Sequence, residues 1–494
     1  MPVKLKNPIE KHFSVLSRYH YYFFTLLFAS KLPVFWHILN LIFLSPPMNY
    51  YCNDDGLNST LNTCPCDNPW WDRSVFTETT QTKFGILCDT QWLISFSQSM
   101  LYVGTLLGAL TFGFLSDTFG RLSMFSMSCL ILAISGCLVS IMPTAVSFIF
   151  MRTIEGLGVG GAIVTSYVLC VEYCGTRHRE MVTALLHIPI NLSHMCLAGV
   201  SYLLRHCDEF QIALSLPIFL CVALYWLTLE SPKWLMDTGK VDEAAVVMEK
   251  ISRFNRNSYE SIKTELEEYQ AARSKNSRTK MKFWQIFRHR KLSLNFICMA
   301  VVYFVCGMGY YGVSQYIGKM SGDIHINVAI SGALLLPGTI TTIFLLKILN
   351  RRTFLIATNF LSGLFMLIEV LICCDATWPR VVIVCICNCF FFMTFIIVFL
   401  YSVELFPTSV RNSVLGILSV VSRLGQISAP IINALPETSA GTIFAVMAML
   451  GAVMCYPLPE TKNTELPSSI EDSKMLPRKV RPSDDEVVRM SQDG

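Results

Sequence analysis

The sequence has few charged residues and lacks the motifs of several common protein classes. Asp, Glu, Lys and Arg make up only 15% of its 494 residues, whereas about 25% is usual in a soluble domain. It contains no G-x-x-x-x-G-K-[ST] loop, which argues against direct use of ATP. No set of nucleophile, base and metal ligands gathers on a loop, and no pore loop recurs. We therefore expect neither an enzyme nor a channel, and no cofactor.

The chain instead contains long apolar segments. Hydrophobic residues make up 53% of the chain and form stretches of about 20 residues, the length that crosses a bilayer as a helix. They predict an all-α polytopic membrane protein of twelve transmembrane helices in two six-helix halves, embedded in the lipid bilayer. The expected spans are residues 21–43, 93–115, 123–142, 147–171, 183–204, 211–229, 294–315, 328–349, 353–373, 381–402, 413–434 and 439–457.

Lys and Arg are unevenly distributed between the two sides of these spans. One side carries 31 of the 39 and the other side 5, with the remaining three inside spans. Because basic residues accumulate on the cytoplasmic side, both termini are expected to be cytoplasmic. The net charge of +4 thus follows from topology and does not suggest a nucleic-acid partner. The predicted parts are the N-tail 1–20, the first half 21–229 with an outside loop 45–92, the central loop 230–293, the second half 294–457 and the C-tail 458–494.

The outside loop carries the marks of an oxidising compartment. Its four cysteines, Cys52, Cys64, Cys66 and Cys88, predict two disulfides and leave three possible pairings. Asn58 begins an accessible N-x-[ST] sequon, so we expect a glycan there.

Two sequence patterns recur in the second half of the chain. The segment 114–121 aligns with 344–351 at an offset of 230 residues, and 172–179 aligns with 404–411 at an offset of 232. Two matches at nearly one offset indicate duplicated halves of parallel topology. In that arrangement a substrate site lies at the membrane midplane between the halves.

Three ionisable residues are expected near that midplane. At 1.5 Å per residue, Lys31 in the first span and Arg423 in the eleventh both lie about 15 Å into the bilayer. Glu155 in the fourth span reaches a similar depth, where it could pair with Arg152 or neutralise Lys31. An intramembrane charge is costly, so it is a candidate functional residue. Either pairing of Glu155 leaves Arg423 without that carboxylate, so Arg423 is our candidate for the positive charge left over.

Several longer motifs resemble one known family. They are GFLSDTFGR (113–121), RTIEGLGVGG (152–161), LESPKWLMDTGKVDEA (229–244), YYGVSQYIGKMSGDIHIN (310–327), YSVELFPTSVRN (401–412), LPETKNTELPSSIED (458–472) and WDRSVFTETTQTKFGILCD (71–89). With these motifs the chain resembles the major facilitator superfamily, and within it the organic cation, organic anion and carnitine transporters. The resemblance covers nearly the whole chain. It implies alternating access and small organic ions as substrates at the plasma membrane.

The repeated motifs predict a conformational gate on the cytoplasmic side. Charges there can pair in one state and separate in the other, which biases a rocking equilibrium. The family's first cytoplasmic motif usually carries more basic residues than this chain has at Thr118 and Leu122. The expected gate residues are Asp117, Arg121, Glu172, Arg179, Glu404 and Arg411.

Substrate charge follows from Arg423 and its surroundings. Relatives that take cations tend to have an acidic residue at this position, whereas anion and carnitine relatives tend to have Arg, so a carboxylate-bearing anion or zwitterion is expected. An organic cation remains the alternative, with its amine held by Glu155 or Glu369. Tyr310 and Tyr311, with the phenylalanines at 390–392, could add an aromatic wall. A non-transporting receptor that keeps the fold is the more distant alternative, and the coupling ion is left open between H⁺ and Na⁺.

Overall fold

The chain folds into two compact units, Met1–Arg278 and Thr279–Gly494. The computed structural model describes residues 8–52, 60–66, 69–175, 178, 181–182, 185–256, 262–275, 283–372, 377–407, 410–462, 467 and 473. The helices that follow the first half within the predicted central loop belong to the first unit.

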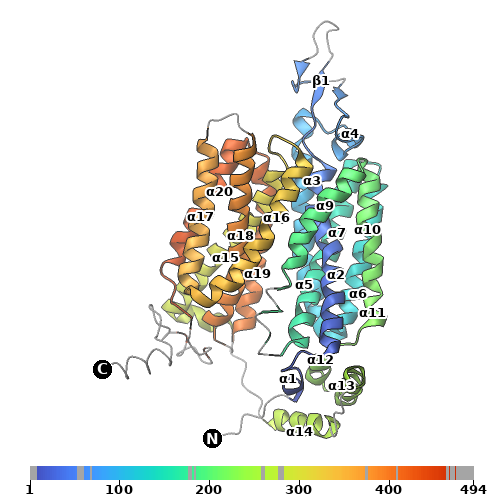
Figure 1. Ribbon diagram of the computed structural model, residues 1–494, viewed down its shortest axis with the longest axis vertical. Helices are drawn as coiled ribbons and strands as arrows, with labels where there is room; N and C mark the ends of the chain where they lie inside the picture. The colour runs from blue at the N-terminus through green and yellow to red at the C-terminus, as the bar shows by residue number, and fades with distance from the viewer. Residues whose placement is uncertain are drawn as a thin grey trace, which may run out of the picture. The chain divides into compact units, whose positions relative to one another are not determined.

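Six apolar helices make up the main bundle of the first unit (Figure 1). A helix pairs most of its backbone groups internally, as a span in lipid must. They are α2 (Arg18–Leu39), α5 (Trp92–Phe119), α6 (Arg121–Ser140), α7 (Ala145–Tyr173), α9 (Ile188–Leu203) and α10 (Cys207–Val222). The short helices α3 (Leu41–Leu44) and α11 (Leu224–Leu227) follow α2 and α10.

Helices α5 and α7 pack backbone against backbone because glycines line their contact. A Cβ on Gly156 would come within 2.1 Å of the Leu101 carbonyl oxygen, and one on Gly160 within 2.1 Å of the Thr105 carbonyl oxygen. Small residues allow such close approach between membrane helices. The glycine run of α7 therefore serves helix packing, and it holds the charged residues of α7 firmly against α5.

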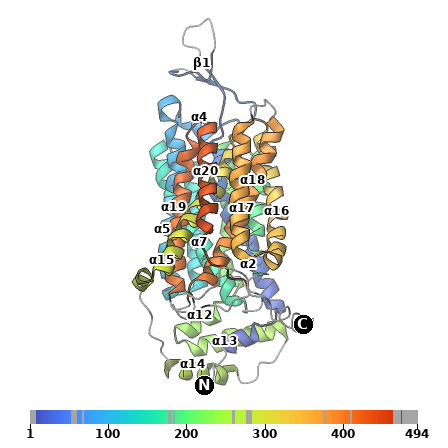
Figure 2. The same cartoon turned by 90° about the vertical axis from the view of Figure 1, so that its left-hand side faces the viewer.

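The two ends of the first unit carry different small elements (Figures 1 and 2). At one end lies an antiparallel sheet of strand order β2-β1-β3, in which Tyr51 pairs with both Leu61 and Trp70. Its strands are β1 (Tyr50–Cys52), β2 (Thr60–Leu61) and β3 (Pro69–Trp71), followed by α4 (Thr80–Phe84) and η1 (Cys88–Thr90). At the other end lie α1 (Pro8–His12), α12 (Pro232–Asp237), α13 (Val241–Asn255) and α14 (Ile262–Lys275).

Helix α13 is amphipathic. It buries Ala244, Met248 and Ile251 on one face, at the spacing of successive helical turns. Phe254 is half-exposed, and its ring packs edge-on against Tyr19 of α2 with ring centroids 5.6 Å apart.

The second unit is a bundle of six long helices (Figure 2). They are α15 (Arg290–Ile317), α16 (Ile324–Ile348), α17 (Arg351–Leu371), α18 (Thr377–Leu405), α19 (Arg411–Asn433) and α20 (Glu437–Cys455), preceded by η2 (Phe283–Arg288). Within this unit α15 packs against α19, and α17 packs against α18 and α20.

The structure confirms the predicted fold class. Among the described residues, eleven helices are long and apolar enough to cross a membrane, and α9 is a shorter apolar helix of 16 residues. With α9 included, six apolar helices fall in each unit. The predicted boundaries agree with these helices to within several residues. Most helices begin a few residues before the predicted span.

Candidate functional site

A closed polar network lies inside the first unit around Arg152 and Glu155 of α7. Arg152 Nη1 lies 3.3 Å from Glu155 Oε2. The same guanidinium donates to Asn40 Oδ1 at 2.7 Å and to Gln98 Oε1 at 2.6 Å. Both charged side chains are 0% exposed. Of the two partners considered for Glu155, the structure selects Arg152.

The second oxygen of Glu155 is also fully engaged. It lies 2.5 Å from His37 Nδ1 and accepts hydrogen bonds from Gln211 at 3.0 Å and Asn40 at 3.3 Å. The network therefore joins α2, α5, α7 and α10 through one buried ion pair. Sequence analysis missed His37, Asn40, Gln98 and Gln211, whose only signal is a polar residue within an apolar helix.

Lys31 of α2 lies apart from this network. Its side chain is buried, with 6% exposure. In the described part of the chain it makes no hydrogen bond or ion pair, and it interacts electrostatically with the thiol of Cys170 on α7. A buried ammonium without a counter-ion is costly. Among the described residues, no ion pair offsets the buried charge of Lys31.

In the second unit, Arg423 lies on α19 where that helix packs against α15. It is half-buried, and its Nη1 lies 3.4 Å from Gln426 Oε1, one turn further along α19. It also interacts electrostatically with the phenol of Tyr311 on α15. The two helices meet closely, because a Cβ on Gly425 would lie 2.2 Å from the Phe304 carbonyl oxygen.

The aromatic wall forms, with a different membership. The ring of Tyr310 lies 4.9 Å from Tyr311, 5.1 Å from Phe392 and 5.8 Å from Phe395, measured between centroids. Phe390 instead stacks on Phe365 of α17 at 5.7 Å. Phe395, one helical turn beyond Phe391, was not singled out from the sequence.

Glu369, the other carboxylate considered for an amine, is held by a neighbouring cation. Arg380 of α18 donates from Nη2 and Nε to Glu369 Oε1, at 2.6 Å and 3.2 Å. The hydroxyl of Tyr316 donates to the same carboxylate at 3.3 Å. Glu369 is 1% exposed, so its charge is neutralised within the second unit.

The predicted gate residues of the first unit form a network at the α5–α6 turn. The Arg121 guanidinium pairs with Asp117 and, through Nε at 3.1 Å, with Glu172 of α7. Glu230, which was not predicted, accepts from the backbone N–H groups of Arg121 and Leu122 at 3.0 Å. Its carboxylate thereby caps the N-terminus of α6, where the helix dipole favours negative charge.

The second unit repeats this arrangement at the α16–α17 turn. Arg351 Nε lies 3.4 Å from Glu404 Oε1, and the Glu460 carboxylate accepts from the backbone N–H of Arg351 at 2.9 Å. Glu230 and Glu460 are 230 residues apart, the same offset as the two arginines. Arg411 donates to the Phe406 carbonyl oxygen at 3.0 Å. Arg179, its predicted counterpart, lies outside the described residues.

Two disulfides form in the predicted outside loop. They join Cys52 to Cys66 and Cys64 to Cys88, which confirms the predicted number and supplies the pairing. The first links strand β1 to the segment before β3, and the second ties that segment to η1. The sequon residue Asn58 lies outside the described residues.

Comparisons with known proteins agree with this architecture. Residues 54–470 match the family model described as sugar (and other) transporter. The chain is 32% identical over 425 residues to solute carrier family 22 member 11 of Homo sapiens, covering 84% of this chain and 76% of that protein. It is 29% identical over 446 residues to the organic cation transporter protein of Drosophila melanogaster, covering 88% and 81%.

A solved structure shows the same fold. The xylose transporter XylE from E. coli, in an inward open conformation, superposes with a TM-score of 0.67 at 16% identity, over 92% of this chain and 99% of that one. These relatives are transporters and not enzymes. The chain therefore belongs to the sugar (and other) transporters of the major facilitator superfamily and, among them, to solute carrier family 22.

Proposed function

We propose that the protein carries small organic ions across the plasma membrane by alternating access of its two units, and that it favours carboxylate-bearing anions or zwitterions. Membership of solute carrier family 22 supports the transport of a small organic solute. The observation that carries the charge preference is Lys31, a buried ammonium that makes no ion pair or hydrogen bond in the described part of the chain.

The ammonium of Lys31 makes a carboxylate the favoured ligand. Removing an ion from water costs several kcal/mol unless a partner of opposite charge compensates. The Glu155 carboxylate is already paired with Arg152 and therefore provides no counter-ion for Lys31. A carboxylate on a substrate supplies the missing charge and forms a hydrogen bond stronger than a neutral one. The same ammonium repels a bare organic cation, so it discriminates by sign.

The acidic residues weaken the case for an organic cation. An amine substrate needs a carboxylate that is free to receive it. Glu155 is paired with Arg152 and bonded to His37, and Glu369 is paired with Arg380. Admitting an amine at either position means breaking a buried ion pair, which costs about 3–5 kcal/mol.

In the second unit, Arg423 is the residue proposed to bind a substrate carboxylate. Its guanidinium presents a planar pair of donors that matches a carboxylate. The rings of Tyr310 and Tyr311 lie on the neighbouring helix, where they can contact the organic part of a substrate. Lys31 and Arg423 thus provide a cationic residue in each unit.

The two loop networks are the proposed elements of the gate. Each joins an arginine at a helix start to a glutamate at the end of another helix of the same unit, Arg121 to Glu172 and Arg351 to Glu404. Such pairs favour whichever state keeps them intact. Breaking them when the units move would set the balance between the two states.

Uptake measurements in expressing cells test the proposal. Labelled benzoate, carnitine and tetraethylammonium represent an anion, a zwitterion and a cation, and each is offered at two external pH values with and without Na⁺. We expect uptake of a carboxylate-bearing probe in excess of tetraethylammonium. The variant Lys31→Met should lose most of that uptake at unchanged surface abundance.

The matched control is Lys240→Met, which removes the same charge from an exposed side chain outside the spans. It should transport like the parent. Faster uptake of tetraethylammonium than of either carboxylate would overturn the charge preference. Absence of uptake of all three, by protein present at the surface, would favour the receptor-like alternative.

A further inference from the structure

A cluster of metal-ligand side chains lies in the first unit, away from the charged residues of its interior. Glu78, His206, Cys207 and Asp208 each place one potential ligand atom so that all four atoms lie within 4.8 Å of one another. Glu78 lies within the loop that the Cys64–Cys88 disulfide closes, and the other three stand at the start of α10. Nothing in the transport proposal uses any of these four residues.

Backbone hydrogen bonds hold the two segments of the cluster together. Residues Glu78 and His206 form a parallel bridge, in which the Cys207 N–H donates to the Glu78 carbonyl oxygen at 3.0 Å. One residue earlier, the Thr77 N–H donates to the Arg205 carbonyl oxygen at 3.1 Å. The ligand residues are therefore positioned by the fold and do not depend on side-chain contacts alone.

The imidazole of His206 is oriented as in a metal ligand. Its Nε2 lies 2.7 Å from Glu78 Oε2, while its Nδ1 is buried and has no hydrogen-bond partner. A buried polar atom without a partner is uncommon in a folded protein. A carboxylate on one ring nitrogen and a free second nitrogen is the arrangement that prepares histidine for a metal.

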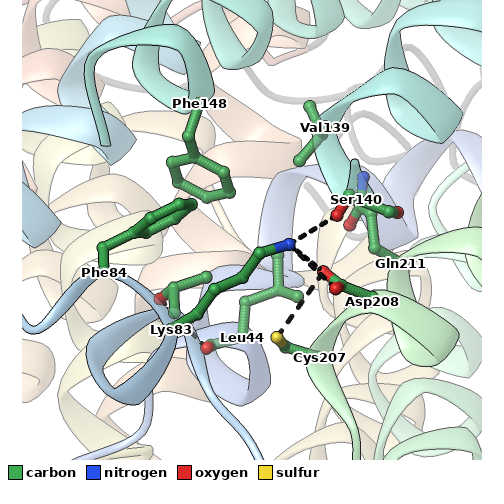
Figure 3. A pocket seen from close by; sticks show the side chains of 10 residues that line it. Leu44, Lys83, Phe84, Val139, Ser140, Phe148, Cys207, Asp208 and Gln211 are labelled. Atoms are coloured by element: carbon green, nitrogen blue, oxygen red, sulfur yellow. Dashed lines mark hydrogen bonds and ion pairs between the residues drawn. The ribbon is translucent and has the colours of Figure 1, made fainter. Parts of the chain in front are cut away.

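Cys207 and Asp208 complete the donor set beside a small cavity. The thiol of Cys207 lies 3.7 Å from Asp208 Oδ1, and Lys83 Nζ approaches both Asp208 oxygens, at 2.7 Å and 2.8 Å (Figure 3). Cys207 is only 4% exposed, whereas the side chains of Glu78 and His206 are about one-third exposed, at 33% and 36%. The thiol is thus shielded from oxidants, and the site still opens to solvent.

We propose that these four residues form a binding site for a divalent metal ion of the zinc class. His206 Nδ1, the Cys207 thiolate and the Asp208 carboxylate supply three ligands of a tetrahedral Zn²⁺ site, with water in the fourth position, while Glu78 orients the imidazole through Nε2. The sulfur and nitrogen donors disfavour Ca²⁺ and Mg²⁺, which take oxygen ligands. On binding, the Cys207 thiol releases its proton to solvent and the thiolate bonds to the metal.

The charges around the site are suited to this ion. Two carboxylates and one thiolate bring three negative charges, so a divalent ion leaves one over, and the Lys83 ammonium lies beside Asp208 to balance it. One oxygen of Asp208 can keep its hydrogen bond to Lys83 while the other binds metal. Bound metal would tie the disulfide-closed loop that carries Glu78 to the start of α10.

Titration of the purified full-length protein with ZnCl₂ by calorimetry tests the site. We expect saturable binding of one Zn²⁺ per chain and no comparable heat with CaCl₂. The variants His206→Gln and Cys207→Ser should each weaken the affinity at least tenfold. The first matched control is Cys196→Ser, which changes an exposed free cysteine of α9. The second is His325→Gln, which changes a histidine that lies beside an aspartate but outside this cluster. Both variants should bind Zn²⁺ like the parent.

A second measurement does not depend on the variants folding. Co²⁺ bound in place of Zn²⁺ should give a thiolate-to-cobalt charge-transfer band in the parent protein and in Cys196→Ser. Absence of that band in the parent, absence of saturable Zn²⁺ binding, or affinities of His206→Gln and Cys207→Ser within twofold of the parent would each overturn the site. These readouts are independent of uptake, so they stand whether or not the transport proposal holds.

Discussion

Arg152 and Glu155 form an ion pair one turn apart on α7, with Nη1 and Oε2 3.3 Å apart and neither side chain exposed. The pair is hydrogen-bonded to the neutral side chains of Asn40, Gln98 and Gln211 and to His37. This geometry identifies it first as a brace of the first unit.

Removing one partner of that pair should destabilise the protein. Glu155→Gln leaves the Arg152 charge buried without its carboxylate, which costs about 3–5 kcal/mol. We expect reduced surface abundance and a lower unfolding temperature in detergent, partly recovered in the double variant Arg152→Gln with Glu155→Gln. Glu209→Gln, the same change at an exposed position of α10, is the control. A stable Glu155→Gln protein that no longer transports would instead assign the pair to transport itself.

Substitutions at Arg423 should act on the substrate and not on folding. Arg423→Lys keeps the charge but loses the planar pair of donors, so the apparent affinity constant for a carboxylate should rise. Losing a hydrogen bond to a charged group costs about 1.5–3 kcal/mol, roughly a tenfold to hundredfold change. Arg423→Asp should abolish carboxylate uptake and admit organic cations.

Uptake per surface molecule separates this role from a purely structural one. If every substitution at Arg423 lowers surface abundance whatever the probe, the residue is a brace. Carboxylate uptake at the parental rate by Arg423→Ala would remove it from the site. Arg253→Lys, at a position with a 78% exposed side chain, should leave both quantities unchanged.

Asp117→Asn should change the rate of transport with little effect on stability. The Asp117 side chain is 65% exposed where it meets Arg121, and such pairs contribute about 0–1 kcal/mol to folding. If the pair belongs to the gate, maximal transport should fall more than apparent affinity, within the range of about five- to 150-fold that coupling energies allow. Asp242→Asn, which removes a similarly exposed ion pair with Lys263, is the control. Unaltered maximal transport at normal abundance would exclude the gate role.

Asn58 should carry the glycan of this protein. Asn58→Gln should shift the protein to the mobility that glycosidase treatment produces. The other sequon, at Asn191, lies in α9 and is 0% exposed, so the single variant should show no remaining glycosidase-sensitive form. A glycosylated protein of unchanged mobility after Asn58→Gln would contradict the predicted sidedness of the outside loop.

Properties that follow from local composition were predictable from the sequence. Span length and hydropathy identify membrane helices because lipid demands about 20 apolar residues per crossing. The buried face of α13 also follows from local sequence, because Ala244, Met248 and Ile251 recur at the spacing of helical turns. The internal duplication was also predictable, since the motif at 114–121 recurs 230 residues later in the sequence.

Properties that depend on which distant residues meet were decided only by the tertiary structure. The sequence left three cysteine pairings, two partners for Glu155 and no role for Glu230 or Glu460. Folding brings Glu155 to Arg152, His37 and Gln211, and it brings Glu230 to the start of α6, 109 residues earlier in the chain. It likewise gathers Glu78 with His206. A polar side chain in an apolar helix shows that a partner is required, but only the packing of the helices determines which residue that partner is.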